Sequence, residues 1–361
     1  MVHNFNPGPA VLPDTVREEV ANAVRRLPNS SLGILEISHR GRIFEEILAS
    51  AEARIRRLLA IPDDFAVMFC HGGATMQFSM VPLNLGQAAS SKPEYLISGV
   101  WSQKAFAEAS RLVGATQNGS GELVQFRELP KVLATAPGCP YLHYTSNNTI
   151  YGTQWTSAPT AEACSLAPLV CDASSDLFSA SVDFSRHDAV YACAQKNFGC
   201  SGLTIAVVRS NLLDQVPKNL PILLSYQTYA KNQSLYNTPA TFAIFVAERY
   251  LAWIENLGGL AEMHRRARER AQRVYACIDE FPVYLPYAEP ASRSLMNATF
   301  RIEDSEREKK FLKEAESAGL FGLKGHKLLG GIRVSMYNGL SMGAIEDLTS
   351  FMKEFAIRWD S

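Results

Sequence analysis

Apolar residues recur every three or four positions in two segments near the beginning of the chain. This spacing puts them on one face of a helix, so two amphipathic helices are predicted. The apolar positions are Val16, Val20, Val24 and Leu27 in the first segment and Ile43, Ile47, Ala51, Ile55 and Leu58 in the second. Asp14 precedes the first segment and is expected to cap its helix, because a carboxylate accepts hydrogen bonds from free N–H groups of the first turn.

From residue 65 onward the pattern changes to short apolar runs, separated by helical stretches that include one from Thr75 and one over 101–113. The runs cover residues 65–70, 95–99, 141–145, 168–174, 189–194 and 203–208. They are nearly continuous in apolar character, which is typical of strands buried on both faces. Their alternation with helices predicts an α/β fold with a mostly parallel sheet, whose carboxyl ends form the ligand-binding edge.

Beyond residue 257 the elements change in kind. A long apolar helix over 241–259 leads to a charged helix, an alternating strand over 296–302, a Lys/Glu-rich helix, a strand over 331–338 and a last amphipathic helix. This order is typical of a smaller α+β domain. We therefore divide the chain into an N-terminal arm (1–15), a large domain (16–257) and a small C-terminal domain (258–361).

Composition narrows the class of protein. The 361 residues carry a formal net charge of -1, so a broad basic surface for nucleic acid or anionic lipid is not expected. Neither a leader sequence nor an apolar stretch long enough for a membrane span is recognised, and a cytosolic protein is expected. The seven cysteines are scattered without CxxC spacing, which disfavours a disulfide framework or a structural zinc site.

Chemically distinctive residues stand at the ends of the predicted strands. Gly73 follows the first run, Trp101 the second and residues 145–149 the third, while Asp172 lies inside the fourth and Lys196 follows the fifth. Because parallel strands end at one edge of a sheet, these residues are expected to lie together. A carboxylate, a lysine, an aromatic ring and a glycine-containing turn suit a flat, phosphorylated, cationic ligand.

Taken singly, each of these residues could also have a purely structural role. A Gly-Gly pair before a helix is commonly a tight turn, although backbone N–H groups there also favour a phosphate. Asp172 could pair with backbone donors or an arginine, and a lysine at a strand end is usually solvated. A lysine whose pKa is lowered by burial, however, can bind an aldehyde as a Schiff base. The combination points to pyridoxal phosphate, the electron sink for amino-acid carbanions.

Several longer segments then carry a resemblance to a known family. They are NFNPGPAVLP, LEISHRGRIFEEI, HGGATMQFSMVPLNL, HYTSNNTIYGT, YACAQKNFGCSGLT, YNTPATFAI, and KGH with GGIRVSMYN. In these segments, from residue 4 to about residue 355, the chain resembles the phosphoserine aminotransferases, class V enzymes that depend on pyridoxal phosphate. The resemblance implies fold type I, with a mostly parallel seven-stranded sheet in the large domain, and a homodimer with shared active sites.

The resemblance also implies roles for single residues around the cofactor. Lys196 is expected to form the Schiff base, Asp172 to hold the pyridinium nitrogen and Trp101 to stack on the ring, with Thr149 beside the cofactor hydroxyl. The residues expected around the cofactor phosphate are Ala74, Thr75 and Gln195, together with Asn237 and Thr238 of the partner subunit.

At the substrate end, the resemblance implies that His39 and Arg40 receive the distal anion and that Arg333 clamps the α-carboxylate, for which a planar bidentate donor is well shaped. His326 and Lys327 are further candidates. The implied reaction is a ping-pong transamination from L-glutamate to 3-phosphohydroxypyruvate, giving O-phospho-L-serine and 2-oxoglutarate. Some family members also act on the four-carbon analogue of vitamin B6 synthesis, and the sequence leaves this second activity open.

Four positions depart from the family pattern. Pro7 stands where many relatives carry Ala or Ser, and its missing N–H puts a substrate role of the arm in doubt. Thr75 replaces an arginine of some relatives, and Lys327 replaces an arginine of several, so a point charge stands in place of a planar fork. Cys200 follows the glycine after the lysine motif, and local packing in a turn is its preferred interpretation.

Three other classes of function are alternatives. A cysteine-dependent hydrolase would use Cys70 with His71, or Cys200, but neighbouring strand residues point to opposite faces. Another fold-type I enzyme, such as an alanine:glyoxylate-type aminotransferase or a cysteine desulfurase, is a closer alternative, although no mobile cysteine loop is evident. An inert relative used as a binding or structural dimer is disfavoured by the intact Lys196, Asp172 and Arg333.

Overall fold

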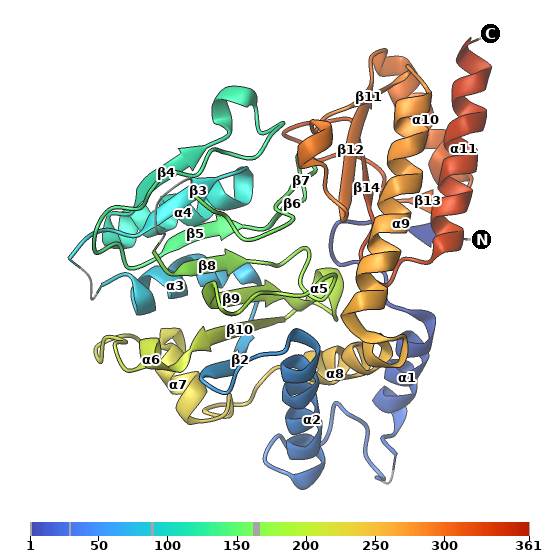
Figure 1. The fold of residues 1–361 in the computed structure, drawn as a ribbon. Coiled ribbons are helices and arrows are strands. Elements are labelled where there is room, and N and C mark those ends of the chain that lie inside the picture. The colour runs from blue at the N-terminus through green and yellow to red at the C-terminus, as the bar shows by residue number, and fades with distance from the viewer. Residues whose placement is uncertain (1, 29, 88–89, 162–166, 361) are drawn as a thin grey trace.

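The chain was analysed as a computed structural model that describes residues 2–28, 30–87, 90–161 and 167–360 (Figure 1). A seven-stranded sheet in the order β2-β10-β9-β8-β5-β3-β4 forms the centre of the large domain. Its strands are β2 (Phe65–His71), β3 (Glu94–Ile97), β4 (Thr116–Ser120), β5 (Leu142–Thr145), β8 (Leu169–Asp172), β9 (His187–Cys193) and β10 (Leu203–Arg209). Only β10 runs antiparallel to its neighbours, so the predicted mostly parallel sheet is confirmed.

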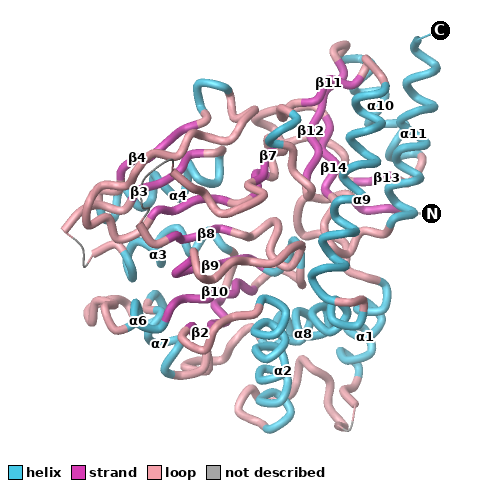
Figure 2. Tube along the Cα trace, viewed as in Figure 1, coloured by secondary structure: helices cyan, strands magenta, loops and turns pink. Residues whose placement is uncertain are grey.

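Helices cover both faces of this sheet, as the tube in Figure 2 shows. They include α2 (Arg42–Leu59), α3 (Gln77–Leu85), α4 (Val100–Val113), α7 (Tyr226–Lys231) and α8 (Thr241–Asn256), whereas α1 (Asp14–Arg25) packs on α8. Along β2, Phe65, Val67 and Phe69 join the core shared with α2 and α8, whereas Met68 and Cys70 join the core shared with α3, α4 and α7. Both faces of the strand are therefore buried, which explains the continuous apolar runs.

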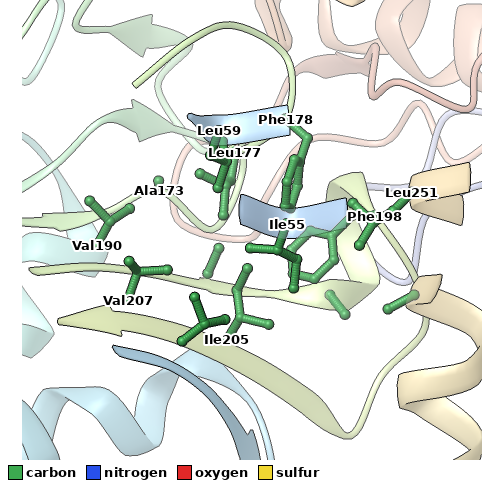
Figure 3. Packing of buried hydrophobic residues seen from close by; sticks show 14 of the residues in the cluster. Ile55, Leu59, Ala173, Leu177, Phe178, Val190, Phe198, Ile205, Val207 and Leu251 are labelled. Carbon is green, nitrogen blue, oxygen red and sulfur yellow. The ribbon is translucent and has the colours of Figure 1, made fainter. Parts of the chain in front are cut away.

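Figure 3 shows the first of these cores from close by. Ile55 and Leu59 of α2 belong to one buried cluster with Val190 of β9 and Ile205 and Val207 of β10. The labelled residues Ala173, Leu177, Phe178, Phe198 and Leu251 belong to the same cluster. The segments that follow β8 and β9 are thus packed rigidly against helices, and these segments carry the site described below.

Two details of the first helices differ from the sequence-based expectation. Pro13 is the N-cap of α1, and Asp14 is its first residue, whose carboxylate accepts a hydrogen bond from Arg17 Nη2 at 2.7 Å. Val24 is 39% exposed and Leu27 lies after the helix ends, although it is buried. The helical spacing of apolar residues therefore continues beyond the end of α1, because Leu27 reaches the same core from the following loop.

The edge strand β4 was not predicted. Its sequence, TQNGS, contains no apolar residue, because the strand pairs only with β3 and leaves its other edge unpaired in the sheet. The helix expected from Thr75 begins instead with a single 3₁₀ turn over Ala74–Met76, and α3 follows directly.

The smaller sheet belongs to the C-terminal part of the chain and contains β11 (Tyr284–Pro286), β12 (Asn297–Ile302) and β14 (Ile332–Ser335), all antiparallel. The helices beside it are α9 (Gly259–Glu280), α10 (Ser305–Ser317) and α11 (Met342–Asp360). Helix α9 contributes Met263 to the large core and Val274 and Ile278 to the small one. The two parts are therefore tied by one continuous helix, and the boundary at residue 258 stays a prediction.

The N-terminal arm packs on the small domain rather than on the domain that follows it in sequence. Strand β1 (His3–Asn4) pairs in parallel with β13 (Leu320–Phe321), and Phe5 is fully buried in the small core. In Figure 1 the N-terminus accordingly lies beside β13 and α11. The arm then crosses toward the large sheet at residues 7–10.

The remaining short elements of the described residues are β6 (Asn147–Asn148), β7 (Thr153–Gln154), α5 (Ala194–Asn197), α6 (Ser210–Leu213) and 3₁₀ turns over Glu122–Val124, Ile222–Leu224 and Pro290–Ser292. Within the described ranges, no helix combines the length and apolar character needed to cross a bilayer, and no group of three metal-ligating side chains was found. Six described cysteines are free, and Cys164 lies outside the described residues.

Candidate active site

A cavity of about 330 Å³ opens at the carboxyl ends of β5, β8 and β9, between the large domain and Arg333 of β14. The cavity brings together most of the residues singled out in the sequence. They are Ala74, Thr75, Trp101, Thr149, Asp172, Gln195, Lys196, His326 and Arg333. Its volume is within the range of small-molecule sites. Larger hollows exist on the surface, but none of them contains Lys196 or Asp172.

Asp172 is the last residue of β8 and is 4% exposed. The strand ends at this carboxylate, and the N–H of Ser174 donates to its Oδ1 at 3.0 Å. Burial raises the pKa of Asp172, while Lys196, Ser174 and Tyr191 act in the opposite direction, and the net shift is upward. A buried carboxylate with few donors favours a cationic partner in the cavity.

Lys196 stands in the short helix α5, directly after β9. Its ammonium lies 5.6 Å from the centre of the Trp101 ring. Burial lowers the pKa of Lys196, but the neighbouring acidic groups, which include Cys193, Tyr337 and Asp172, outweigh it and the net shift is upward. The expected lowered pKa is therefore wrong. A second cation in the cavity would offset the charge of these acidic groups and so favour the neutral amine of Lys196.

Trp101 is the second residue of α4, at the end of the turn that follows β3. Its Nε1 donates a hydrogen bond to Thr149 Oγ1 at 3.0 Å, and this bond fixes the orientation of the indole in the cavity wall. Lys104, one turn further along α4, lies 4.9 Å from the same ring centre. The ring thus offers a flat, electron-rich surface next to Lys196.

The opposite end of the cavity is built from backbone. Gly72 has a φ of 81°, and a Cβ added at Gly73 would meet no atom within 4 Å, so the turn leaves open space in front of its peptide groups. Ala74 and Thr75 continue the wall, and α3 follows them. Peptide N–H groups before a helix are suited to a phosphate.

Three buried polar atoms in the cavity wall have no hydrogen-bond partner in the described part of the chain. They are Thr145 Oγ1, Gln195 Oε1 and Arg333 Nε. Buried polar groups are rarely left without a partner. Unused donors and acceptors, the buried carboxylate of Asp172 and an open glycine turn fit pyridoxal phosphate, which offers a phosphate, a hydroxyl and a ring nitrogen.

Positive charge gathers on the small-domain side of the cavity. Arg333 is 6% exposed, and its Nη1 donates to the backbone oxygen of Thr149 at 3.1 Å. Burial lowers the pKa of His326, and the charges of Arg333, Lys327 and Lys104 lower it further. Several cations within reach of one cavity favour an anionic substrate.

The structure does not bring every predicted residue to this cavity. Arg40, Thr238 and Lys327 are exposed, and His39 and Asn237 are half-buried; none of the five lines the cavity of their own chain. Lys327 borders a neighbouring hollow with Lys324 and His326. The other four lie in the loops before α2 and α8.

Other residues of the cavity were missed in the sequence. Ser174 and Ser175 follow Asp172, so the rule that ligands meet at strand ends could have identified them. Asn147, which also lines the cavity, lies within the stretch 145–149 that the sequence places at this edge. Pro7 and Gly8 of the arm also line the cavity, although the missing N–H of Pro7 put a role of the arm in doubt in the sequence. The arm therefore does reach the site, even though Pro7 has no N–H to donate.

The thiols offer little support for a cysteine nucleophile. Cys70 is buried, and burial raises its pKa to about 12. Burial likewise raises the pKa of Cys200, which packs at the edge of the large core. A nucleophilic cysteine requires a lowered pKa, so the packing interpretation of Cys200 is favoured.

Comparison with known proteins gives a consistent result. The family model Aminotransferase class-V matches residues 2–348. The phosphoserine aminotransferase of Desulfosudis oleivorans is 44% identical over 357 residues, which are 98% of each chain. Among solved structures, the phosphoserine aminotransferase from Bacillus circulans subsp. alkalophilus has a TM-score of 0.94 at 39% identity and covers 99% of both chains. The PLP-bound enzyme from Trichomonas vaginalis has a TM-score of 0.90 at 35% identity and covers 98% of this chain and 100% of its own.

Proposed function

Because the chain belongs to the class-V aminotransferase family, and within it to the phosphoserine aminotransferases, we propose that it transfers the amino group of L-glutamate to 3-phosphohydroxypyruvate. It is a pyridoxal-phosphate-dependent aminotransferase with a mostly parallel fold-type I sheet. The products would be O-phospho-L-serine and 2-oxoglutarate, which assigns the enzyme to serine biosynthesis. The cytosolic location expected from the sequence stays a prediction.

One observation carries this assignment. Asp172, Lys196 and Trp101 come from three separate elements, β8, α5 and α4, and line one cavity with Lys196 5.6 Å from the indole centre. When bound, pyridoxal phosphate supplies an electron sink that stabilises negative charge at the amino-acid Cα. The carboxylate of Asp172 would hold the ring nitrogen in its protonated form, and Lys196 would hold the cofactor aldehyde through Nζ.

Lys196 Nζ would also move the proton. The amine lies 5.6 Å from the centre of the Trp101 ring and, with an amino acid bound in the cavity, would take up the proton of the substrate Cα. The neighbouring acidic groups that raise its pKa would then stabilise the ammonium that forms when Nζ takes up this proton. Ala74, Thr75 and Gln195 would hold the cofactor phosphate, and the Thr149 hydroxyl would keep the Trp101 indole oriented for stacking.

The cations at the small-domain side would select the substrates. Arg333 would bind the α-carboxylate, and its bond to the Thr149 carbonyl keeps the guanidinium directed into the cavity. His326 and Lys327 would receive the distal phosphate or carboxylate. Two substrates that each carry an anion at both ends explain a site with cations on more than one side.

A homodimer with shared sites is part of this proposal. His39, Arg40, Asn237 and Thr238 are too remote to line the cavity of their own chain, and they lie in surface loops. We propose that these loops enter the cavity of the partner subunit, so that Arg40 meets the distal anion and Asn237 and Thr238 meet the cofactor phosphate.

The test is a coupled assay of glutamate with 3-phosphohydroxypyruvate, with pyruvate and glyoxylate as alternative acceptors. We expect turnover with the phosphorylated acceptor to exceed turnover with either control; equal turnover of pyruvate or glyoxylate would assign an alanine:glyoxylate-type activity instead. In parallel, the purified protein is reduced with borohydride and digested. The cofactor should be recovered on the peptide that contains Lys196, and recovery on another lysine would refute the role of Lys196.

A further inference from the structure

Tyr337 is a buried residue that none of the preceding roles uses. It follows β14, four residues after Arg333, and is 1% exposed. Its ring packs against Ala267 and Met296. Its hydroxyl donates a hydrogen bond to the backbone carbonyl of Pro7 at 3.0 Å. A side chain of the small domain therefore holds the N-terminal arm at a defined point.

At this point the arm lies against Lys196. The N–H of Ala10 donates to the backbone oxygen of Gln195 at 2.8 Å. A Cβ added at Gly8 would lie 3.3 Å from Lys196 Cγ and 3.8 Å from Gln195 Cγ, so the arm backbone packs directly on the methylene groups of Lys196. Gly8 has a φ of 134°, which other residues rarely adopt. The arm thus forms one wall of the channel in which the Lys196 side chain is held.

The surroundings of the Tyr337 hydroxyl support a donor role. Burial raises the pKa of Tyr337, and the raised value persists although Lys196, the Asn297 amide and Arg333 act against it. The phenol therefore keeps its proton at neutral pH and can donate it to Pro7. The charges of Lys196 and Arg333, the two cations that act on the substrate, therefore both reach the phenol.

We propose that Tyr337 is a positioning residue for the transamination site: by holding the Pro7 carbonyl, its hydroxyl seats the arm against Lys196 and limits the positions that the Lys196 amine adopts. This inference rests on the proposed role of Lys196 as the group that moves the proton. The small domain then contributes to the site in two ways: Arg333 binds the substrate, and Tyr337 holds the arm that positions Lys196.

The test compares Tyr337→Phe with Tyr284→Phe. Tyr284 is a matched control, because it is also buried in the small domain and its hydroxyl also donates to a backbone carbonyl, that of Met352, at 2.6 Å. Hydrogen exchange of the arm peptide, residues 3–10, is measured in the protein without substrate. One lost buried hydrogen bond should accelerate this exchange about tenfold in Tyr337→Phe. Tyr284→Phe should leave it unchanged.

Kinetics give the second readout. We expect kcat of Tyr337→Phe to fall about tenfold while KM for glutamate stays within about twofold, because Arg333 is untouched and only the proton-moving amine is less well placed. Equal effects of the two Phe variants, or a change in KM alone, would overturn the proposal. Exchange data do not depend on the identity of the substrate, so a failed transaminase assay and a failed positioning role are distinguishable.

A second variant keeps the test valid if Tyr337→Phe does not fold. Gly8→Ala leaves Tyr337 intact but adds a methyl group against Lys196 at a φ that alanine tolerates poorly. It should displace the arm, accelerate exchange of residues 3–10 and lower kcat in the same way. An arm that exchanges faster with no loss of kcat would refute the link between the arm and Lys196.

Discussion

The indole Nε1 of Trp101 donates to Thr149 Oγ1 at 3.0 Å, and the backbone oxygen of the same threonine accepts from Arg333 Nη1 at 3.1 Å. One residue thus orients both the ring expected to stack on the cofactor and the guanidinium expected to bind the substrate. The two bonds use different atoms of Thr149, the side chain and the main chain, and so can be separated by mutation.

Thr149→Val removes the hydroxyl and keeps the carbonyl. The indole then loses its acceptor, and we expect the affinity for pyridoxal phosphate to fall about fivefold, the range of a single neutral hydrogen bond. KM for glutamate should change less, because the bond to Arg333 remains. Titration of the apoenzyme by Trp fluorescence measures the first effect. Thr149→Ser keeps the acceptor and should bind the cofactor as the parent does; equal weakening in both variants would contradict the role of the hydroxyl.

Lys196→Ala removes the amine that holds the cofactor and moves the proton. We expect the rate of transamination to fall by about 10³-fold or more, since both nucleophilic and acid–base contributions are lost. Thermal unfolding should stay cooperative, because the lysine is not a core residue. Lys353→Ala on α11, whose ammonium pairs with Glu280 at the surface, is the control and should keep its activity. Near-normal turnover of Lys196→Ala would exclude the assigned role.

The sequence predicted the large sheet well, because strands buried on both faces leave an unambiguous apolar signal, as in β2 and β10. It failed for β4, whose residues TQNGS are polar at the sheet edge. The cavity residues Asp172 and Lys196 could be predicted for a related reason: each follows or ends such a strand. Tyr337 could not, since its contact with Pro7 joins positions separated by 330 residues and leaves no local pattern.

The proposed sharing of sites between subunits predicts complementation. Lys196→Ala and Arg40→Ala are each expected to be inactive or severely impaired as homodimers. When they are denatured and refolded together, half of the dimers should be mixed, and each mixed dimer should contain one site with both residues intact. Activity should then recover to about a quarter of the parent value. No recovery, with mixed dimers verified by two affinity tags, would show that Arg40 acts in its own chain.

Asp176 lies next to the site but does not line the cavity of Lys196. Its carboxylate accepts hydrogen bonds from Ser146 Oγ at 2.5 Å and from Gln154 Nε2 at 3.1 Å. Gln154 Oε1 in turn accepts from the N–H of Leu295 at 2.8 Å, so this network joins the large domain to the small one. Burial raises the pKa of Asp176 from 3.8 to about 6, although the two hydrogen bonds act against the shift.

A raised pKa means that the native state binds this proton more tightly than the unfolded state does. Ionisation of Asp176 therefore lowers the stability of the parent protein as the pH rises from about 4 to about 6, by up to about 3 kcal/mol. Asp176→Asn cannot ionise, so its free energy of unfolding relative to the parent should rise by that amount over this window and stay constant above it. Urea unfolding at a series of pH values measures the difference.

Asp183→Asn is the control with the opposite sign, because hydrogen bonds from Ser185 lower the pKa of Asp183 and ionisation stabilises the native state there. A relative stability of Asp176→Asn that does not change between pH ~4 and ~6 would show that Asp176 is ionised at no cost in the folded protein.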